Sequence, residues 1–287
     1  MFDKKSGIAS LYLVLSALLL ISVFNKIAIA GDNLVLAVHP YLPEEELKKK
    51  FTPLVEYLSH EIGKTINVRI GGDYEEHIQY IGLNKVDIAY MGPASYVYMA
   101  DEFGDKPVLA RLEVNGHPWF QGNIVVHKNS DIKSLVDLKG KRVAFGDPRS
   151  TMSYIVPHHM LHKAGVFGDV TTRHQFLYSH NNVALGVLSG DFDAGAIKPA
   201  VFKKFESSGL RTILKTPKIA EHLFVVRAGL PADQITRLRS AMMKMSKTEK
   251  GMLALQAIKQ SITGLVEARS SDYDNLRKII SESKGFH

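Results

Sequence analysis

The order of short apolar runs and amphipathic segments constrains this chain more than any other feature. Apolar runs at residues 33–38, 66–70 and 86–90 are separated by segments whose apolar residues recur at helical spacing. Strands that alternate with helices in this way predict an α/β fold with a largely parallel sheet. In such sheets ligands bind in loops beyond the carboxyl ends of the strands. This rule selects three loops: residues 39–43, 92–96 and 147–153.

The remainder of the chain repeats the alternation. We expect one further helix in the first half, at 74–83, and a break near Pro53 in the helical segment that begins at residue 44, because proline suits a first helical position. The other expected strands are at 122–127, 142–145, 193–197 and 223–226. The other expected helices are at 154–164, 183–188, 232–245, 247–258 and 272–283.

The loop between the strand at 142–145 and the helix at 154–164 carries three hydroxyls, on Ser150, Thr151 and Ser153. The first backbone N–H groups of a helix have no partner within it, and the helix dipole places partial positive charge there. Such a terminus can hold a phosphate-like anion without lysine or arginine. The alternative is a helix N-cap, which uses a single hydroxyl. The surplus of hydroxyls favours the anion site.

The N-terminus resembles a secretory signal. Lys4 and Lys5 precede an apolar run at residues 8–24, and Ala28 and Ala30 supply the small residues read by a signal peptidase. We expect cleavage after Ala30, so that residues 1–30 are a signal peptide and the mature protein is periplasmic. A retained membrane anchor is the alternative, but the run is short for a membrane span. The sequence has no cysteine, which excludes both a cysteine-linked lipid anchor and disulfides.

Several function classes lack their signatures in this sequence. The formal net charge is +7, but no run of Lys or Arg is interleaved with aromatic residues, so we do not expect nucleic-acid binding. His158 and His162 are one helical turn apart, but no acidic residue of a metal-hydrolase helix accompanies them. No P-loop, dinucleotide-binding glycine pattern or nucleophile elbow is present. We expect no cofactor, no metal and no catalysis, with a secreted phosphoester hydrolase as the alternative.

Four segments together carry a resemblance to a known family. They are residues 87–96, 137–153, 180–195 and 272–277. In order and spacing they are similar to the phosphate/phosphite/phosphonate-binding proteins of ABC importers. The resemblance implies a periplasmic binding protein of the type II fold. In this fold two lobes, each a mostly parallel sheet flanked by helices, enclose a ligand cleft. Lobe 1 would comprise residues 31–116 and 223–287, and lobe 2 would comprise residues 117–222.

The resemblance also implies a function. The protein would be a monomer that captures a small phosphorus oxyanion (phosphonate, phosphite or phosphate) by lobe closure and delivers it to an ABC permease. A receptor that reports its ligand to a membrane signalling partner is the alternative.

The site residues follow from the same resemblance. The implied ligand-binding residues are Ser150, Thr151, Met152, Ser153, Ser95, Tyr96, His180 and Tyr41. The chain departs from its relatives at Tyr154, where they often carry glycine, and at Asn181, where aspartate is frequent. An acidic residue at 181 could order a cationic group, so its absence weakens the case for an aminoalkylphosphonate. Lys198 pairs with a second acidic group of the ligand or is a solvated loop charge. For Trp119, we favour packing at the crossing between the lobes.

Overall fold

A computed structural model describes residues 33–167 and 171–285. The residues from Leu34 onward form one compact unit. The predicted signal peptide, residues 1–30, lies outside the described residues. Within the described ranges no helix is long and apolar enough to cross a membrane.

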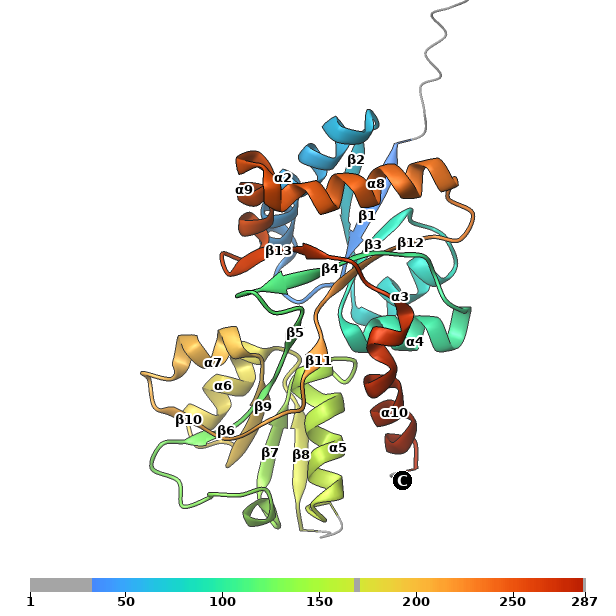
Figure 1. Cartoon of the computed structure of the whole chain (residues 1–287). Helices are drawn as coiled ribbons and strands as arrows, with labels where there is room; N and C mark the ends of the chain where they lie inside the picture. Colours follow the sequence, from blue (N-terminus) through green and yellow to red (C-terminus); the bar gives the residue numbers. More distant parts are fainter. Residues whose placement is uncertain (1–32, 168–170, 286–287) are drawn as a thin grey trace, which may run out of the picture. The chain divides into compact units, whose positions relative to one another are not determined.

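A six-stranded mixed sheet contains both the first and the last strand of the compact unit (Figure 1). Its strands in spatial order are β13 (Ile262–Val266), β4 (Val108–Val114), β12 (Leu223–Val226), β3 (Ile88–Met91), β1 (Leu34–Val38) and β2 (Ile66–Ile70). Strand β1 runs parallel to β2 and β3, whereas β12 is antiparallel to β3 and β4. The carboxyl ends of β1 and β3 therefore adjoin the amino end of β12.

Helices cover both faces of this sheet. They are α2 (Glu44–Ile62), α3 (Tyr74–Gly82), α4 (Pro93–Phe103), α8 (Ala232–Lys244), α9 (Glu249–Ile258) and α10 (Asp274–Ser283). Leu36 and Val38 of β1 pack with α2, α8 and α9, whereas Ala37 packs on the other face with α3, α4 and α10. This division follows from the two-residue period of a strand.

A second mixed sheet has five strands. In spatial order they are β10 (Leu210–Lys215), β6 (Asn123–His127), β9 (Ala194–Ile197), β7 (Arg142–Phe145) and β8 (Arg173–Phe176). Its helices are α5 (Val156–Lys163), α6 (His180–Leu188) and α7 (Pro199–Phe205). Between the two sheets the chain crosses twice, as the antiparallel strands β5 (Trp119–Phe120) and β11 (Ile219–Ala220) (Figure 1). The expected α/β architecture with two sheets is confirmed.

Three expectations need correction. The sheets are mixed rather than mostly parallel, because β4, β6, β10, β12 and β13 form antiparallel pairs. Helix α2 continues through Pro53 without a break, because its apolar face from Leu47 to Ile62 is buried. Burial of that face outweighs the cost of one proline, about 3 kcal/mol. Strands β4, β5, β8, β10, β11 and β13 and helix α7 were not among the expected elements.

Most of the hydroxyl loop is helical, whereas we expected the helix to begin only at Tyr154. Residues Thr151–Ile155 form a π-helical turn that leads directly into α5, so the helical segment begins before Tyr154. The Ser150 side chain caps this turn by accepting a hydrogen bond from the Ser153 backbone N–H. The loop therefore presents its hydroxyls on the first turn of a helix.

Candidate functional site

A cavity of about 780 Å³ lies between the two sheets, and all three loops selected from the sequence line it. Its walls come from the ends of β1 and β3, the start of β12, the hydroxyl loop, and the first residues of α6 and α7. The volume is typical of a site for a small molecule.

Three polar atoms converge in front of Gly92, at the start of α4. A Cβ atom placed on this glycine would lie 3.9 Å from His222 Nε2, 4.0 Å from His39 Nε2 and 4.0 Å from Ser95 Oγ. We call His39, Ser95 and His222 the imidazole wall. Ser95 Oγ is buried and has no hydrogen-bond partner among the described residues. Because buried hydroxyls are nearly always hydrogen-bonded, this atom indicates a position for a polar ligand.

The hydrogen bonds of His39 fix the role of each ring nitrogen. Its Nδ1 lies 3.2 Å from the backbone oxygen of Tyr90. A carbonyl oxygen only accepts, so Nδ1 carries the proton. Burial, followed by the charge of His222, lowers the pKa of His39 well below its usual value. The ring is therefore neutral, and Nε2 is a hydrogen-bond acceptor that faces the cavity.

His222 is oriented by its neighbour Glu221. The Nδ1 atom of His222 lies 2.9 Å from Glu221 Oε2, so this nitrogen also carries a proton and Nε2 faces Gly92. Burial by itself would raise the pKa of Glu221, but its hydrogen bonds with His222 outweigh that effect and lower it. The rings of His39 and His222 stack with centroids 5.6 Å apart, and Tyr90 stacks on His222 at 5.5 Å. This stacking holds both imidazoles in place.

The hydroxyl loop, residues 150–153, forms the opposite wall. Thr151 Oγ1 accepts a hydrogen bond of 2.9 Å from the backbone N–H of Ala94, and Ser150 Oγ accepts one from Ser153. Each of these two hydroxyls keeps its own proton for donation, and both residues line the cavity. Met152 also lines the cavity and packs with the apolar core of the six-stranded sheet.

Ser153 does not face the cavity. Its hydroxyl donates to the backbone oxygen of Ala196 at 2.6 Å and accepts from the backbone N–H of Gly146 at 2.8 Å. The side chain is fully buried between β7 and β9. Its donor is already used, so the structure assigns Ser153 to holding the loop on the sheet rather than to ligand contact.

His180 and Tyr41 line the cavity as expected. The backbone N–H of Lys198 donates to His180 Nδ1 at 3.2 Å, which places the ring proton on Nε2. Burial and the nearby charge of Lys198 lower the pKa of His180 well below its usual value. His180 is therefore a neutral donor, the opposite of His39. The Tyr41 ring lies against His39 with centroids 4.9 Å apart.

Tyr96 points away from the cavity, against our expectation. Its hydroxyl lies 3.3 Å from Asp105 Oδ1, and its ring packs on Tyr273 at 5.0 Å. Ser95 and Tyr96 are adjacent in α4, and adjacent residues of a helix differ by about 100° in direction. Since Ser95 faces the cavity, the Tyr96 side chain cannot.

Several cavity residues were missed from the sequence. His39 lies in a loop that the sheet rule selected, and its neighbour Tyr41 was named instead. His222 precedes an antiparallel strand, where that rule gives no signal. Trp119 of β5 lies at the expected crossing and also lines the cavity. His158 and His162 have ring centroids 6.5 Å apart, and the part of the chain that the structure describes holds no group of three potential metal ligands.

Comparisons with known proteins agree with this architecture. The model of the family described as "ABC transporter, phosphonate, periplasmic substrate-binding protein" matches residues 36–273. The phosphate-import protein PhnD of Mycolicibacterium smegmatis is 27% identical over 273 residues, covering 86% of this chain and 85% of the relative. The phosphonates-binding periplasmic protein of Escherichia coli is 25% identical over 225 residues, covering 75% and 67%.

Among solved structures, PhnD1 from Prochlorococcus marinus in complex with methylphosphonate superposes with a TM-score of 0.77. It is 22% identical, and the match covers 88% of this chain and 98% of that one. This likeness shows a shared fold. The family match spans most of the sequence, including every segment that forms the cavity walls. The chain therefore belongs to the phosphonate family of periplasmic substrate-binding proteins of ABC transporters.

Proposed function

We propose that this protein is the solute-binding component of an ABC importer and that its cavity binds a small phosphorus oxyanion. The main support is the convergence of His39 Nε2, His222 Nε2 and the unpartnered Ser95 hydroxyl on one point, opposite the Ser150 and Thr151 hydroxyls. The names of the relatives, which refer to phosphate and phosphonate, agree with this ligand class.

Apart from His222 Nε2, which accepts when the ring is neutral and donates when it is charged, the proposed contacts divide into donors and one acceptor. Ser95, Ser150 and Thr151 donate their hydroxyl protons to the oxygens of the anion, and His180 donates through Nε2–H. His39 Nε2 is an acceptor, so it accepts a hydrogen bond from a P–OH group. A monoprotonated oxyanion offers both kinds of partner. Hydrogen bonds to a charged acceptor inside a water-poor cavity are stronger than those between neutral groups.

We further propose that the two lobes, residues 31–116 with 223–287 and residues 117–222, close on the ligand about β5 and β11. Three contacts across the cavity support this. Ala94 N–H donates to Thr151 Oγ1, Arg149 forms an ion pair of 2.7 Å with Glu75, and the Arg149 guanidinium lies 4.7 Å from the centroid of the Tyr98 ring. Thr151 would thus contact the ligand and join the lobes. Closure excludes water from the anion.

The remaining parts of the proposal concern the protein's place in the cell. We propose a monomer that is exported by a signal peptide cleaved after Ala30 and that delivers its ligand to an ABC permease, without catalysing a reaction on it. The bonding of Ser153 supports the last point, because its hydroxyl donates to a carbonyl oxygen and not to a base.

A ligand panel on the exported protein tests the proposal. The full chain is expressed, the protein is purified from the periplasm, and its mass shows whether cleavage follows Ala30. Methylphosphonate, phosphite and phosphate are compared with sulfate by thermal shift and titration calorimetry. We expect at least one phosphorus oxyanion to raise the Tm, since binding to the folded state alone stabilises it. In Ser95→Ala the same concentration should give a smaller rise. If none of the phosphorus oxyanions raises the Tm, the proposed ligand class is wrong.

A further inference from the structure

The cavity is much larger than a phosphorus oxyanion needs, and the wall that the proposed contacts leave unused is basic. Six cationic residues line the cavity, namely Lys50, Arg149, Lys198, Lys203, Lys215 and Lys259. Within the described ranges, only two acidic residues, Glu46 and Glu221, line it with them. Arg149 is paired with Glu75, and Lys50 lies 3.9 Å from Glu46. The other four lysines form no ion pair among the described residues.

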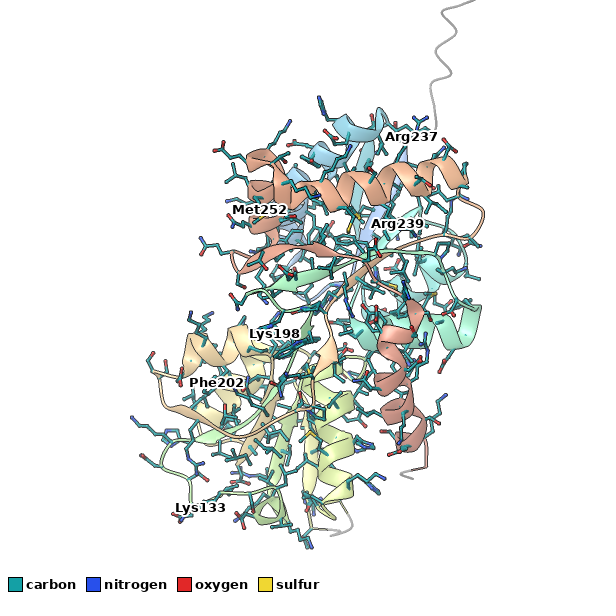
Figure 2. All side chains as sticks on the ribbon, viewed as in Figure 1. Lys133, Lys198, Phe202, Arg237, Arg239 and Met252 are labelled. Atoms are coloured by element: carbon teal, nitrogen blue, oxygen red, sulfur yellow. The ribbon has the colours of Figure 1, made fainter. Side chains whose placement is uncertain are left out.

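Of these four lysines, Lys198 contacts two residues of the proposed site, His180 and Tyr41. It immediately precedes α7, at the end of β9, where α7 faces the six-stranded sheet (Figure 2). Its backbone N–H holds His180, and its ammonium lies 4.8 Å from the centroid of the Tyr41 ring. The Tyr41 ring also lies against His39. Lys198 and a member of the imidazole wall therefore contact the same tyrosine ring.

The electrostatics of Lys198 agree with this position. Burial, followed by repulsion from Lys259, lowers the pKa of the Lys198 side chain to about 8. The same ammonium contributes to the lowered pKa of both His39 and His180. A partly buried cation next to the site, without a carboxylate in ion-pair distance, is stabilised by an anionic group that enters the cavity.

We infer that the physiological ligand carries a second acidic group, a carboxylate or a second phosphoryl group on a short chain, and that this group binds Lys198. This inference rests on the proposed function, because the phosphoryl end of the same molecule occupies the imidazole wall and the hydroxyl loop. Lys203, Lys215 and Lys259 also line the cavity and add positive potential to it. Phosphonocarboxylates fit this description, whereas an aminoalkylphosphonate would bring its ammonium towards Lys198.

The test compares two ligands that differ only in the charge of the second group. Phosphonoacetate carries a carboxylate, and phosphonoacetamide carries a neutral amide of nearly the same shape. Each is titrated into the wild-type protein by calorimetry, with the fluorescence of the single tryptophan, Trp119 in the cavity wall, as a second readout. We expect phosphonoacetate to bind about tenfold tighter or more, as a charge-assisted contact in a partly buried site would give.

Two variants test whether Lys198 causes the preference for phosphonoacetate over phosphonoacetamide. Lys198→Met keeps an unbranched side chain of similar length and removes its charge. The ratio of the dissociation constants of phosphonoacetamide and phosphonoacetate should therefore fall towards one. Lys204→Met changes the same residue type on α7, the helix that Lys198 precedes, but Lys204 is exposed and does not line the cavity, so the ratio should stay at its wild-type value.

The outcomes separate this inference from the function on which it rests. If phosphonoacetate and phosphonoacetamide bind equally well to the wild type, or if the preference survives in Lys198→Met, the inference is wrong and the phosphorus-binding function stands. Tighter binding of 2-aminoethylphosphonate than of phosphonoacetate would also overturn it. If no phosphorus compound binds, the proposed function fails and the inference fails with it.

Discussion

The hydroxyl loop and the imidazole wall line the same cavity, but they are assembled differently from the sequence. The hydroxyl loop is continuous in sequence, and its three hydroxyls are visible as a motif at the start of a helix. The imidazole wall is assembled from three separate segments, at the ends of β1 and β3 and at the start of β12. In the folded protein, the loop has most of its hydrogen bonds satisfied internally. The wall holds the Ser95 hydroxyl, which has no partner among the described residues, and the Nε2 atoms of His39 and His222.

This difference teaches that a local motif and a ligand contact are separate properties. Of the three loop hydroxyls, that of Ser153 is used to attach the loop to β9, and those of Ser150 and Thr151 have their acceptor sides occupied. A group that already holds the fold together is expected to affect stability when removed. An unpartnered group that faces a cavity is expected to affect affinity. Four predictions test this division, from the largest expected effect to the smallest.

Acid should destabilise the folded protein through its buried histidines. Burial lowers the pKa of His39, His77 and His180, to about 4 for His77. Below about pH 6.5, the unfolded chain binds protons that the folded chain excludes, so the free energy of unfolding falls as the pH falls towards the folded pKa values. Each group contributes about 1 kcal/mol per pH unit, and the total between pH 6.5 and 4.5 should reach several kcal/mol. Urea unfolding at several pH values measures this slope.

A variant of His77 measures how much this residue contributes to the pH dependence of the unfolding free energy. Both ring nitrogens of His77 are buried without a hydrogen-bond partner among the described residues, so phenylalanine should fill its place. His77→Phe is expected to make the pH dependence less steep by about one proton. His60→Phe on the exposed face of α2 is the control. A wild-type protein that is equally stable at pH 6.5 and 4.5 would contradict this account of the histidines.

Ser95→Ala should reduce ligand affinity without a loss of stability. The hydroxyl has no partner within the described protein, so its removal breaks no internal hydrogen bond. If its acceptor is a charged oxygen, the loss should be about 1.5–3 kcal/mol of binding free energy. Calorimetry with the tightest-binding oxyanion measures the affinity, and the Tm of the ligand-free protein measures stability. A large drop in the Tm of the free protein would mean that Ser95 has a structural role.

Ser153→Ala should show the reverse pattern. The change leaves the buried oxygen of Ala196 and the N–H of Gly146 without their hydroxyl partner, at a cost of about 1–3 kcal/mol of unfolding free energy. Ser150→Ala is the matched comparison. The wild-type Ser150 side chain caps the helical turn and also lines the cavity, so this variant should lower both stability and affinity. Chemical denaturation gives the first quantity and calorimetry the second. An affinity loss in Ser153→Ala larger than that in Ser150→Ala would reverse the assignment of the two serines.

Tyr96→Phe should have the smallest effect. The lost hydroxyl bonds to Asp105 outside the cavity, and the ring keeps its packing on Tyr273. We expect unchanged affinity and a stability change below about 1 kcal/mol. Tyr41→Phe is the matched control inside the cavity, where the hydroxyl belongs to a lining residue. Equal losses of affinity in the two variants would place Tyr96 at the ligand after all.

Site residues could be predicted where a short motif in the sequence marks them. Ser150, Thr151, Met152, Ser95, His180 and Tyr41 were named from the sequence, and all six line the cavity. The errors arose where neighbours in sequence take different directions, as Ser95 and Tyr96 do in α4. His222 was missed because it enters the site only through the antiparallel pairing of β12 with β3, and no periodicity around residue 222 shows that pairing.

The sequence by itself determined the alternation of strands and helices, the loops that face the ligand side of the sheets, and the family. These properties depend on hydrophobic period and local motifs, which a single segment carries. Only the tertiary structure decided which hydroxyl is unpartnered, which nitrogen of each histidine carries the proton, and where Lys198 lies. Those properties depend on atoms brought together from distant segments, and a hydrogen bond or a pKa is set by the partner that the fold supplies.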